Sequence, residues 1–262
     1  MKTNPLDIPS DLVERLQRAQ RVAVLTGAGV SAESDIPTFR DAQGGLWASF
    51  KPEDLATPEA FRRDPKRVWE WYEWRRQRIH TVHPNPGHFA LAKLEQRLPR
   101  CTLVTQNVDG LHQRAGSRRV LELHGNITRT KCFAENTLVD AWEDCGEVPP
   151  RCPRCGGLLR PDVVWFGEML PLEICEEAEE AARSCDLFLC VGTSTQVQPA
   201  AELPFLALRA GADVLEVNPQ PTPLSRHATW VLRAPSGHAL PALLEAAWPE
   251  PTHLPTPLRT NP

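Results

Sequence analysis

The stretch TGAGVSAESDIPTFRD, residues 26–41, directly follows the short apolar run at residues 22–25. Such a run is typical of a buried parallel strand. Glycines at the end of a strand let the backbone approach a ligand closely, and their N–H groups can face a phosphate. The stretch does not complete the Gly-x-Gly-x-x-Gly pattern of dinucleotide-binding folds, because Ala32 stands at its last position and Asp41 comes too early to bind the ribose. By itself, the glycine pair predicts only a tight turn between a strand and a helix.

Length and composition indicate a globular protein. A chain of 262 residues can bury a sizeable core, and its net charge of −4 gives no general attraction to nucleic acid or to an anionic membrane. No apolar stretch approaches the roughly 20 residues of a membrane span, and no apolar signal segment follows the N-terminus. Cys175, Cys185 and Cys190 lie in apolar or helical context and are expected to be buried thiols. We therefore expect a cytoplasmic protein that binds neither nucleic acid nor membranes.

Apolar runs alternate with amphipathic stretches along the chain. The runs predict parallel strands covered on both faces at residues 21–25, 101–105, 186–191 and 213–217. Helices are expected at residues 9–19, 88–97, 172–184 and 200–210, with Ser10 as an N-cap and Gly211 as a C-cap. This alternation favours an α/β fold with a Rossmann-like, doubly wound parallel sheet, in which ligands bind at the carboxyl ends of the strands.

Two segments interrupt the alternation and are expected to be insertions. Residues 52–86 are rich in tryptophan and arginine and predict a helical insertion, whereas residues 129–159 are rich in turns and cysteine and predict a small zinc-ribbon-like module. The sheet domain would then comprise residues 1–51, 87–128 and 160–248. The proline-rich end, residues 249–262, is expected to be a disordered tail.

Polar residues follow the predicted strands. Gln106 to His112 follow one apolar run, and His124 follows another at residues 120–123; further along, Gly192-Thr193-Ser194 and Asn218-Pro219 end two more. Any one of these turns alone would be a surface loop, and His124 alone would be a core histidine at a strand end. Because the carboxyl ends of parallel strands share one edge, the turns together predict a ligand site.

The ordered set of motifs resembles one family. GAGVS with IPTFR, TQNVDGLH at residues 105–112, LHG at 123–125, VVWFGE at 163–168 and VGTS at 191–194 occur in the order found in the sirtuins, the NAD-dependent protein deacylases. The resemblance covers residues 21–241. It implies that NAD is a co-substrate and that acylated lysines of proteins are the substrates. In this family the acyl oxygen attacks C1′ of the NAD ribose, nicotinamide leaves, and the products are free lysine and 2′-O-acyl-ADP-ribose.

The resemblance also implies individual roles. His124 would be the general base, which suits a side chain with a pKa near working pH. Asn107 and Asp109 would hold the ribose and the nicotinamide amide, and Gln106 would contact the same ribose. Asn218 would bind ribose hydroxyls in place of the missing acid. The other implied cofactor-binding residues are Gly27, Ala28, Gly29, Ser31, Ile36, Pro37, Phe39, Arg40, Trp47, Val108, Gly192, Thr193, Ser194, Pro219, Gln220 and Ser236.

One apolar run is expected to bind the protein substrate. By composition, Val163, Val164, Trp165, Phe166 and Gly167 are a strand edge in the core. In sirtuins this segment pairs with the substrate backbone as an added strand, a mode that tolerates many sequences. We therefore expect a broad set of protein substrates.

Acyl specificity is predicted from one pair of side chains. Tyr72, the chain's single tyrosine, and Arg75 would face the same way on a helix. On composition alone, this helix is amphipathic, with aromatic rings in the core and arginines in water. Tyr-x-x-Arg at this place resembles the class III sirtuins, which remove succinyl, malonyl and glutaryl groups, because arginine and a phenol can pair with an acyl carboxylate. The alternative within the family is an enzyme that is chiefly a deacetylase.

The remaining cysteines predict a metal site. Cys152 and Cys155 have the spacing of a zinc knuckle. Upstream, Cys132 is followed three residues later by Glu135 instead of a second cysteine, so Cys145 is the remaining candidate. A structural zinc on Cys132, Cys145, Cys152 and Cys155 is one interpretation, and a decayed, metal-free site is the other.

Two other classes of function stay open at this point. A nicotinamide oxidoreductase should show the complete glycine pattern and a distal acid, and it would leave NAD intact. A binding module that senses NAD through this fold, with a zinc ribbon, would bind NAD without releasing nicotinamide.

Overall fold

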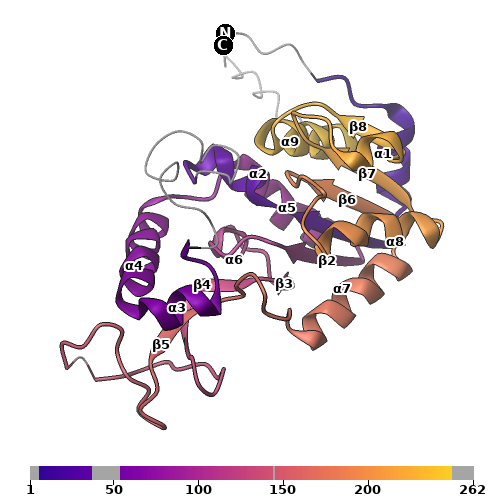
Figure 1. The fold of residues 1–262 in the computed structure, drawn as a ribbon. Helices are drawn as coiled ribbons and strands as arrows, with labels where there is room; N and C mark the ends of the chain where they lie inside the picture. The colour runs from indigo at the N-terminus through magenta and orange to yellow at the C-terminus, as the bar shows by residue number, and fades with distance from the viewer. Residues whose placement is uncertain (1–5, 37–53, 144, 250–262) are drawn as a thin grey trace, which may run out of the picture.

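The centre of the fold is a sheet of six parallel strands (Figure 1). This computed structural model describes residues 6–36, 54–143 and 145–249. The strand order is β3-β2-β1-β6-β7-β8. Val24 of β1, for example, lies opposite Leu103 of β2 and Leu189 of β6. The strands are β1 Arg21–Thr26, β2 Arg100–Thr105, β3 Val120–Glu122, β6 Leu187–Val191, β7 Asp213–Val217 and β8 Trp230–Leu232. The predicted Rossmann-like α/β fold is confirmed.

Helices cover both faces of this sheet because successive strand residues point to opposite sides. Val22 and Val24 of β1 face one core, and Ala23 and Leu25 face the other. The first core is covered by α1 Ser10–Arg18, α5 Pro86–Arg97 and α9 Ser236–Ala247; the second by α7 Leu172–Ser184 and α8 Leu203–Arg209. In the described residues no helix is both long and apolar enough to cross a membrane.

Three predicted helix ends need correction. Ser10 is the first residue of α1, and the N-cap is Pro9, without a side-chain hydrogen bond. The helix predicted at residues 200–210 is split into a 3-10 turn, η5 Ala200–Glu202, and α8, because Pro204 lacks an N–H and fits only the first turn of an α-helix. Helix α5 begins two residues earlier than predicted, where the Asn85 side chain accepts a hydrogen bond from the Gly87 N–H.

The two predicted insertions pack together beyond the edge of the large sheet (Figure 1). This region contains α3 Pro58–Arg63, α4 Pro65–Thr81 and an antiparallel pair, β4 Gly125–Cys132 and β5 Leu159–Val163, which extends beyond the predicted bounds 129–159 of the second insertion on both sides. Phe61, Tyr72, Ile127 and Trp165 share a buried core there. A smaller cluster surrounds Cys132 and Cys152. The exact domain limits stay a prediction, and residues 250–262 of the predicted tail lie outside the described part of the chain.

The chain changes direction next to β1, and this position determines where a ligand can bind. After β1 the chain adds β2 and β3 on one side, and later β6, β7 and β8 on the other. Ligands of such sheets bind at this switch point, outside the carboxyl ends of the strands. Short elements follow the strands at this edge: α2 Ala28–Ser31, η1 Ala32–Ser34, α6 Leu111–Arg114 and η6 Pro223–Arg226.

Close packing at the switch point explains the glycine pair. A Cβ on Gly29 would lie 2.7 Å from the Gly192 carbonyl oxygen, and one on Gly27 would lie 2.8 Å from Thr193 Cβ. The N–H groups of both glycines are used within the chain: Gly27 donates to the Val191 carbonyl at 3.2 Å and Gly29 to the Gly192 carbonyl at 2.8 Å. Their role is therefore close contact between two loops rather than donation to a phosphate.

Candidate active site

A cavity of about 1480 Å³ lies at this edge of the sheet. It extends from the loops after β1, β2, β3, β6 and β7 to helix α4 and the segment after β5. Most of the predicted cofactor residues line it: Gly27, Ala28, Gly29, Ser31, Ile36, Gln106, Asn107, Val108, Asp109, Gly192, Thr193, Ser194, Asn218, Pro219 and Gln220. His124 and all seven predicted substrate residues line it as well.

Of the remaining predicted cofactor residues, Ser236 is the one that the structure describes, and it does not line this cavity. Ser236 begins α9, where its hydroxyl donates to Glu33 at 3.2 Å, and the neighbouring Pro235 lines the cavity instead. Pro37, Phe39, Arg40 and Trp47 lie outside the described residues.

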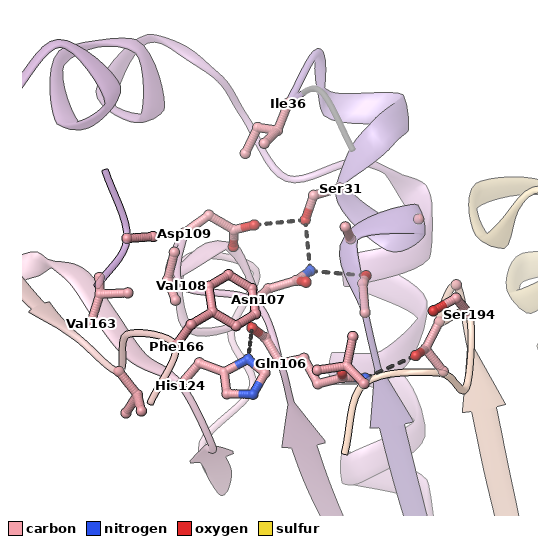
Figure 2. Close-up of a pocket in the computed structure, with 18 of the residues that line it drawn as sticks. Ser31, Ile36, Gln106, Asn107, Val108, Asp109, His124, Val163, Phe166 and Ser194 are labelled. Atoms are coloured by element: carbon pink, nitrogen blue, oxygen red, sulfur yellow. Dashed lines mark hydrogen bonds between the residues drawn. The ribbon is translucent and has the colours of Figure 1, made fainter. Parts of the chain in front are cut away.

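A buried chain of hydrogen bonds fixes Asp109 and Asn107 (Figure 2). The Ser31 hydroxyl donates to Asp109 Oδ2 at 2.8 Å and accepts from Asn107 Nδ2 at 3.1 Å. Asn107 Nδ2 also donates to the Gly27 carbonyl at 3.1 Å, so toward a ligand this side chain offers only its acceptor Oδ1. Burial raises the pKa of the Asp109 carboxyl, while donation from the Leu111 N–H and from Ser31 opposes that shift.

His124 is arranged to act as a base. Its Nδ1 lies 2.9 Å from the Gln106 carbonyl oxygen (Figure 2), and because a carbonyl only accepts, Nδ1 carries the hydrogen and Nε2 keeps its lone pair in the neutral ring. Burial lowers the pKa of His124, although the Gln106 carbonyl opposes the shift. The Gln106 side chain donates to Thr193 Oγ1 at 2.8 Å and so connects the loops after β2 and β6.

Two histidines are buried next to the loop after β2: His88, which was not predicted, and His112, which was expected only as one of the polar residues that follow a strand. His88 Nδ1 accepts from the Asn85 N–H, so His88 Nε2 carries the hydrogen and points to Ser31 Oγ at 3.4 Å. His112 Nε2 lies 2.9 Å from Thr26 Oγ1. Burial lowers the pKa of His88 to about 4 and that of His112 to about 3, and the proximity of His88 adds to the shift of His112. Both rings therefore support the site as neutral groups.

The other end of the cavity contains Tyr72 and Arg75 of helix α4. Tyr72 is buried, and its hydroxyl oxygen accepts from Trp165 Nε1 at 2.9 Å. The partly buried Arg75 guanidinium lies over the Trp71 ring, 4.8 Å from its centroid. Burial raises the pKa of Tyr72 and lowers that of Arg75, and the charge of Arg75 opposes the shift of Tyr72. The alternative interpretation of α4, an amphipathic helix with its arginines in water, fits the exposed Arg78. It does not fit Arg75, which lines the cavity.

An ion pair between the buried Arg160 and the partly buried Glu168 holds the segment after β5. Arg160 is 2% exposed, its guanidinium stacks 3.3 Å from the Trp165 ring centroid, and it bonds Glu168. Glu168 also accepts from the Trp165 N–H at 2.8 Å. The Val164 and Phe166 N–H groups donate at 2.9 Å to the carbonyls of His124 and Ala56. Three successive N–H groups are thus used within the chain, so an added substrate strand must pair with other backbone groups here.

A separate group of side chains fits a metal ion. Ligand atoms of Cys132, Glu135, Cys152 and Cys155 all lie within 4.8 Å of one another. Three thiols and a carboxylate are ligands that zinc accepts, and the group lies outside the large cavity, as a structural site would. Cys145, which was expected as the fourth ligand, is not in this group. Its side chain is exposed, and its sulfur lies 3.6 Å from the Glu143 carbonyl oxygen. The fourth member is instead Glu135, at the position three residues after Cys132 where the sequence lacks a second cysteine.

Comparisons with known proteins agree with this geometry. The model of the Sir2 family matches residues 27–199. The NAD-dependent protein deacylase of Aquifex aeolicus is 56% identical over 208 residues, which cover 79% of this chain and 87% of the relative. A solved structure of a Sir2 homologue–NAD complex is 42% identical with a TM-score of 0.85, covering 94% of this chain and 96% of that chain. Another, of Sir2 with a p53 peptide and NAD⁺, is 31% identical with a TM-score of 0.79, covering 90% and 96%. The protein described here therefore belongs to the Sir2 family, the sirtuins.

Proposed function

We propose that this protein is an NAD-dependent protein-lysine deacylase that prefers acyl groups ending in a carboxylate. The deacylase activity is that of the family to which the chain belongs. The acyl preference rests on one observation: Tyr72 and Arg75 line the same cavity as His124.

Different side chains of the cavity would hold the two ends of NAD, and His124 would act between them. NAD supplies a ribose with nicotinamide as its leaving group. Asn107 and Asp109, fixed through Ser31, would hold the nicotinamide end, and the loops after β6 and β7 would hold the adenosine end. His124, with an unprotonated Nε2, would accept a proton from a ribose hydroxyl, and burial, which lowers the pKa of this ring, keeps it neutral near pH 7.

The acyl end of the cavity favours a negative charge. A carboxylate that enters an apolar cavity without a partner costs several kcal/mol. The Arg75 guanidinium offsets this cost with charge-assisted hydrogen bonds, each worth about 1.5–3 kcal/mol, and Tyr72 adds a hydroxyl donor. An acetyl group has no carboxylate, so the arginine contributes nothing to its binding. We therefore propose succinyl and malonyl groups as preferred substrates, with acetyl as a slower one.

The rim of the cavity supports protein substrates. Among the lining residues, Phe166, Met169, Leu172 and Val197 are large apolar side chains that are 53%, 89%, 66% and 44% exposed. Exposed apolar groups around a cleft are typical of a surface that binds another chain. Because such contacts and backbone pairing depend little on side-chain identity, we propose acylated lysines in a broad set of proteins as the substrates.

Cysteine usage supports a reducing location. In the described residues none of the eight cysteines forms a disulfide. Disulfides are rare in the cytosol, where thiols are kept reduced. We retain a cytoplasmic location and the absence of nucleic-acid and membrane partners as proposals.

The test compares one peptide with three lysine modifications: acetyl, succinyl, and succinamoyl, in which a neutral amide replaces the carboxylate at nearly constant shape. Nicotinamide release and the mass of the peptide and ADP-ribose products are measured. We expect kcat/KM for succinyl to exceed that for acetyl by about ten- to hundredfold, and succinamoyl to fall to the acetyl level. Equal rates on succinyl and acetyl would make the enzyme a general deacetylase. Binding of NAD without nicotinamide release from any peptide would favour a binding module.

A further inference from the structure

We propose that Glu135, rather than Cys145, is the fourth ligand of the structural zinc ion, together with Cys132, Cys152 and Cys155. This inference concerns the small module and does not depend on the acyl preference. It rests on a repeat in the backbone that makes Glu135 the structural equivalent of Cys155.

Two six-residue turns carry the four ligands, and their hydrogen bonds match one for one. In the first turn, residues 132–137, the Asn136 N–H donates to the Cys132 carbonyl at 2.9 Å. In the second, residues 152–157, the Gly156 N–H donates to the Cys152 carbonyl at 2.9 Å. The N–H of each leading cysteine also donates to the carbonyl five residues on, at 2.9 Å for Cys132 and 2.7 Å for Cys152.

The conformation after the fourth residue matches as well. Asn136 has φ of 53° and Gly156 has φ of 73°, so both turns pass through the left-handed region at the same step. Asparagine and glycine are the residues that adopt this region most readily. Each turn is also closed by an isolated antiparallel bridge, Lys131 with Leu138 and Arg151 with Leu158. The first turn therefore has the geometry of a metal-binding knuckle, with a glutamate at its second ligand position.

The side chains converge as this geometry requires. Cys132 Sγ lies 3.4 Å from Cys155 Sγ, and the Glu135 carboxylate lies within 4.8 Å of all three sulfur atoms. Arg154, inside the second turn, pairs with Glu135 Oε2 at 3.3 Å. The Thr137 hydroxyl lies 3.5 Å from the same oxygen. These contacts orient the carboxylate from outside the ligand set, as second partners of metal ligands commonly do.

The ligand set predicts how the site differs from one with four cysteines. Three thiolates and one carboxylate carry the same total charge as four thiolates, so the charge on the ion is balanced equally. Carboxylate oxygen is a harder ligand than thiolate sulfur, and zinc sites with more sulfur retain the ion better against chelators. The site should therefore hold zinc, but less tightly than a variant in which Glu135 is replaced by cysteine.

The experiment uses the full chain purified without chelator and compares wild type with Glu135→Gln, Glu135→Cys, Cys145→Ser and Cys155→Ser. Zinc per chain is measured by elemental analysis, and zinc retention by titration with a chelator. We expect Cys145→Ser to retain zinc like wild type, and Glu135→Gln to release it at a chelator concentration at least about tenfold lower. Glu135→Cys should retain zinc to a higher chelator concentration than wild type. Cys155→Ser is the positive control for loss of a ligand.

Cobalt substitution counts the thiolates directly. The sulfur-to-cobalt charge-transfer band grows with the number of bound thiolates, so Glu135→Cys should raise its intensity by about one third over wild type. Cys145→Ser should leave the band unchanged. The proposal is overturned if Cys145→Ser loses zinc as Cys155→Ser does, if its cobalt band falls, or if wild type contains no zinc. Because Glu135→Cys keeps four ligands at the site, its cobalt band decides the question even if Glu135→Gln does not fold.

Discussion

The indole Nε1 of Trp165 donates a hydrogen bond to the Tyr72 hydroxyl oxygen at 2.9 Å, across 93 residues of sequence. An indole N–H can only donate, so Tyr72 is the acceptor in this pair and its own hydroxyl hydrogen is directed to another group. In the cavity that Tyr72 shares with Arg75, a carboxylate of the acyl group is the acceptor that would use both donors. In the proposed function, Trp165 would thus position Tyr72 for acyl recognition.

Replacing Trp165 by phenylalanine tests this role. Trp165→Phe keeps an aromatic ring against Arg160 and Phe61 but removes the N–H, so the Tyr72 hydroxyl is no longer fixed as a donor to the acyl group. We expect the ratio of kcat/KM for succinyl to that for acetyl to fall about two- to tenfold, the value of one neutral hydrogen bond. Addition of Tyr72→Phe to this variant should change the ratio little. A fully additive loss in the double variant would mean that the two residues act independently.

Arg75→Met should depress desuccinylation about ten- to hundredfold and leave deacetylation similar to wild type. Methionine preserves much of the apolar stem that packs beside Trp71, while the charge that pairs with the acyl carboxylate is lost. The measurement is kcat/KM on succinyl and acetyl versions of one peptide. Arg78→Met, an exposed position on the same helix, is the matched control. Equal losses on both substrates would show that Arg75 supports the helix rather than binding the acyl group.

His124→Ala should lower kcat by about 10²–10⁴ while the melting temperature and NAD affinity stay close to wild type. The wild-type pH profile gives a second readout. Since burial lowers the pKa of His124 below its ordinary 6.5, the base stays deprotonated in slightly acidic solution, and the acid limb of kcat/KM should lie below pH 6.5. A limb above that value, or near-normal turnover by a folded His124→Ala protein, would remove His124 from the proposed role.

Apolar runs in the sequence were sufficient to locate β1, β2, β6 and β7, because strands buried on both faces are mostly apolar. The short β8 was missed, since its three apolar residues, between Thr229 and Arg233, are too few to form such a run. The order of the motifs predicted His124, Asn107 and Asp109 at the carboxyl edge of the sheet, and all three line the cavity there. The contacts of His88, His112 and Trp165 were not predictable, because each depends on pairing between segments far apart in the chain. The choice between Glu135 and Cys145 likewise depends on how two distant turns meet.

Gly29→Ala should weaken both the fold and NAD binding. The added Cβ would lie 2.7 Å from the Gly192 carbonyl oxygen and 2.9 Å from the Gly192 Cα, and both are backbone atoms that cannot rotate away. Overpacking of this kind costs about 1–3 kcal/mol. Because the displaced loops line the cofactor end of the cavity, KM for NAD should rise more than KM for the peptide. Equal changes in the two KM values would indicate a general loss of folded protein instead.

The buried pair His88 and His112 predicts a loss of stability in mild acid. Their pKa values in the folded protein, about 4 and about 3, lie below the ordinary value of 6.5 that the unfolded chain restores. Between these values the unfolded state binds more protons, so the free energy of unfolding falls as the pH drops below 6.5, by up to about 1.4 kcal/mol per pH unit for each histidine. His124, whose pKa is also lowered, acts in the same direction, while Asp109, whose pKa is raised, acts against it.

Urea unfolding at intervals from pH 7.5 to pH 5 measures how the free energy of unfolding changes with pH. This range lies above the pKa values of ordinary carboxyl groups, so their titration contributes little. His88→Gln keeps a polar side chain beside Ser31 and Asn85, but glutamine does not bind a proton in this pH range. The variant should therefore lose the contribution of one histidine to the pH dependence of the free energy of unfolding, about 1.4 kcal/mol per pH unit at most. His80→Gln, at an exposed position, is the matched control and should leave this pH dependence unchanged. Zinc content is followed in the same samples, because loss of the ion in acid would also destabilise the protein. A wild-type stability that is flat from pH 7.5 to pH 5, with zinc retained, would mean that His88 and His112 reach water or accept protons without unfolding.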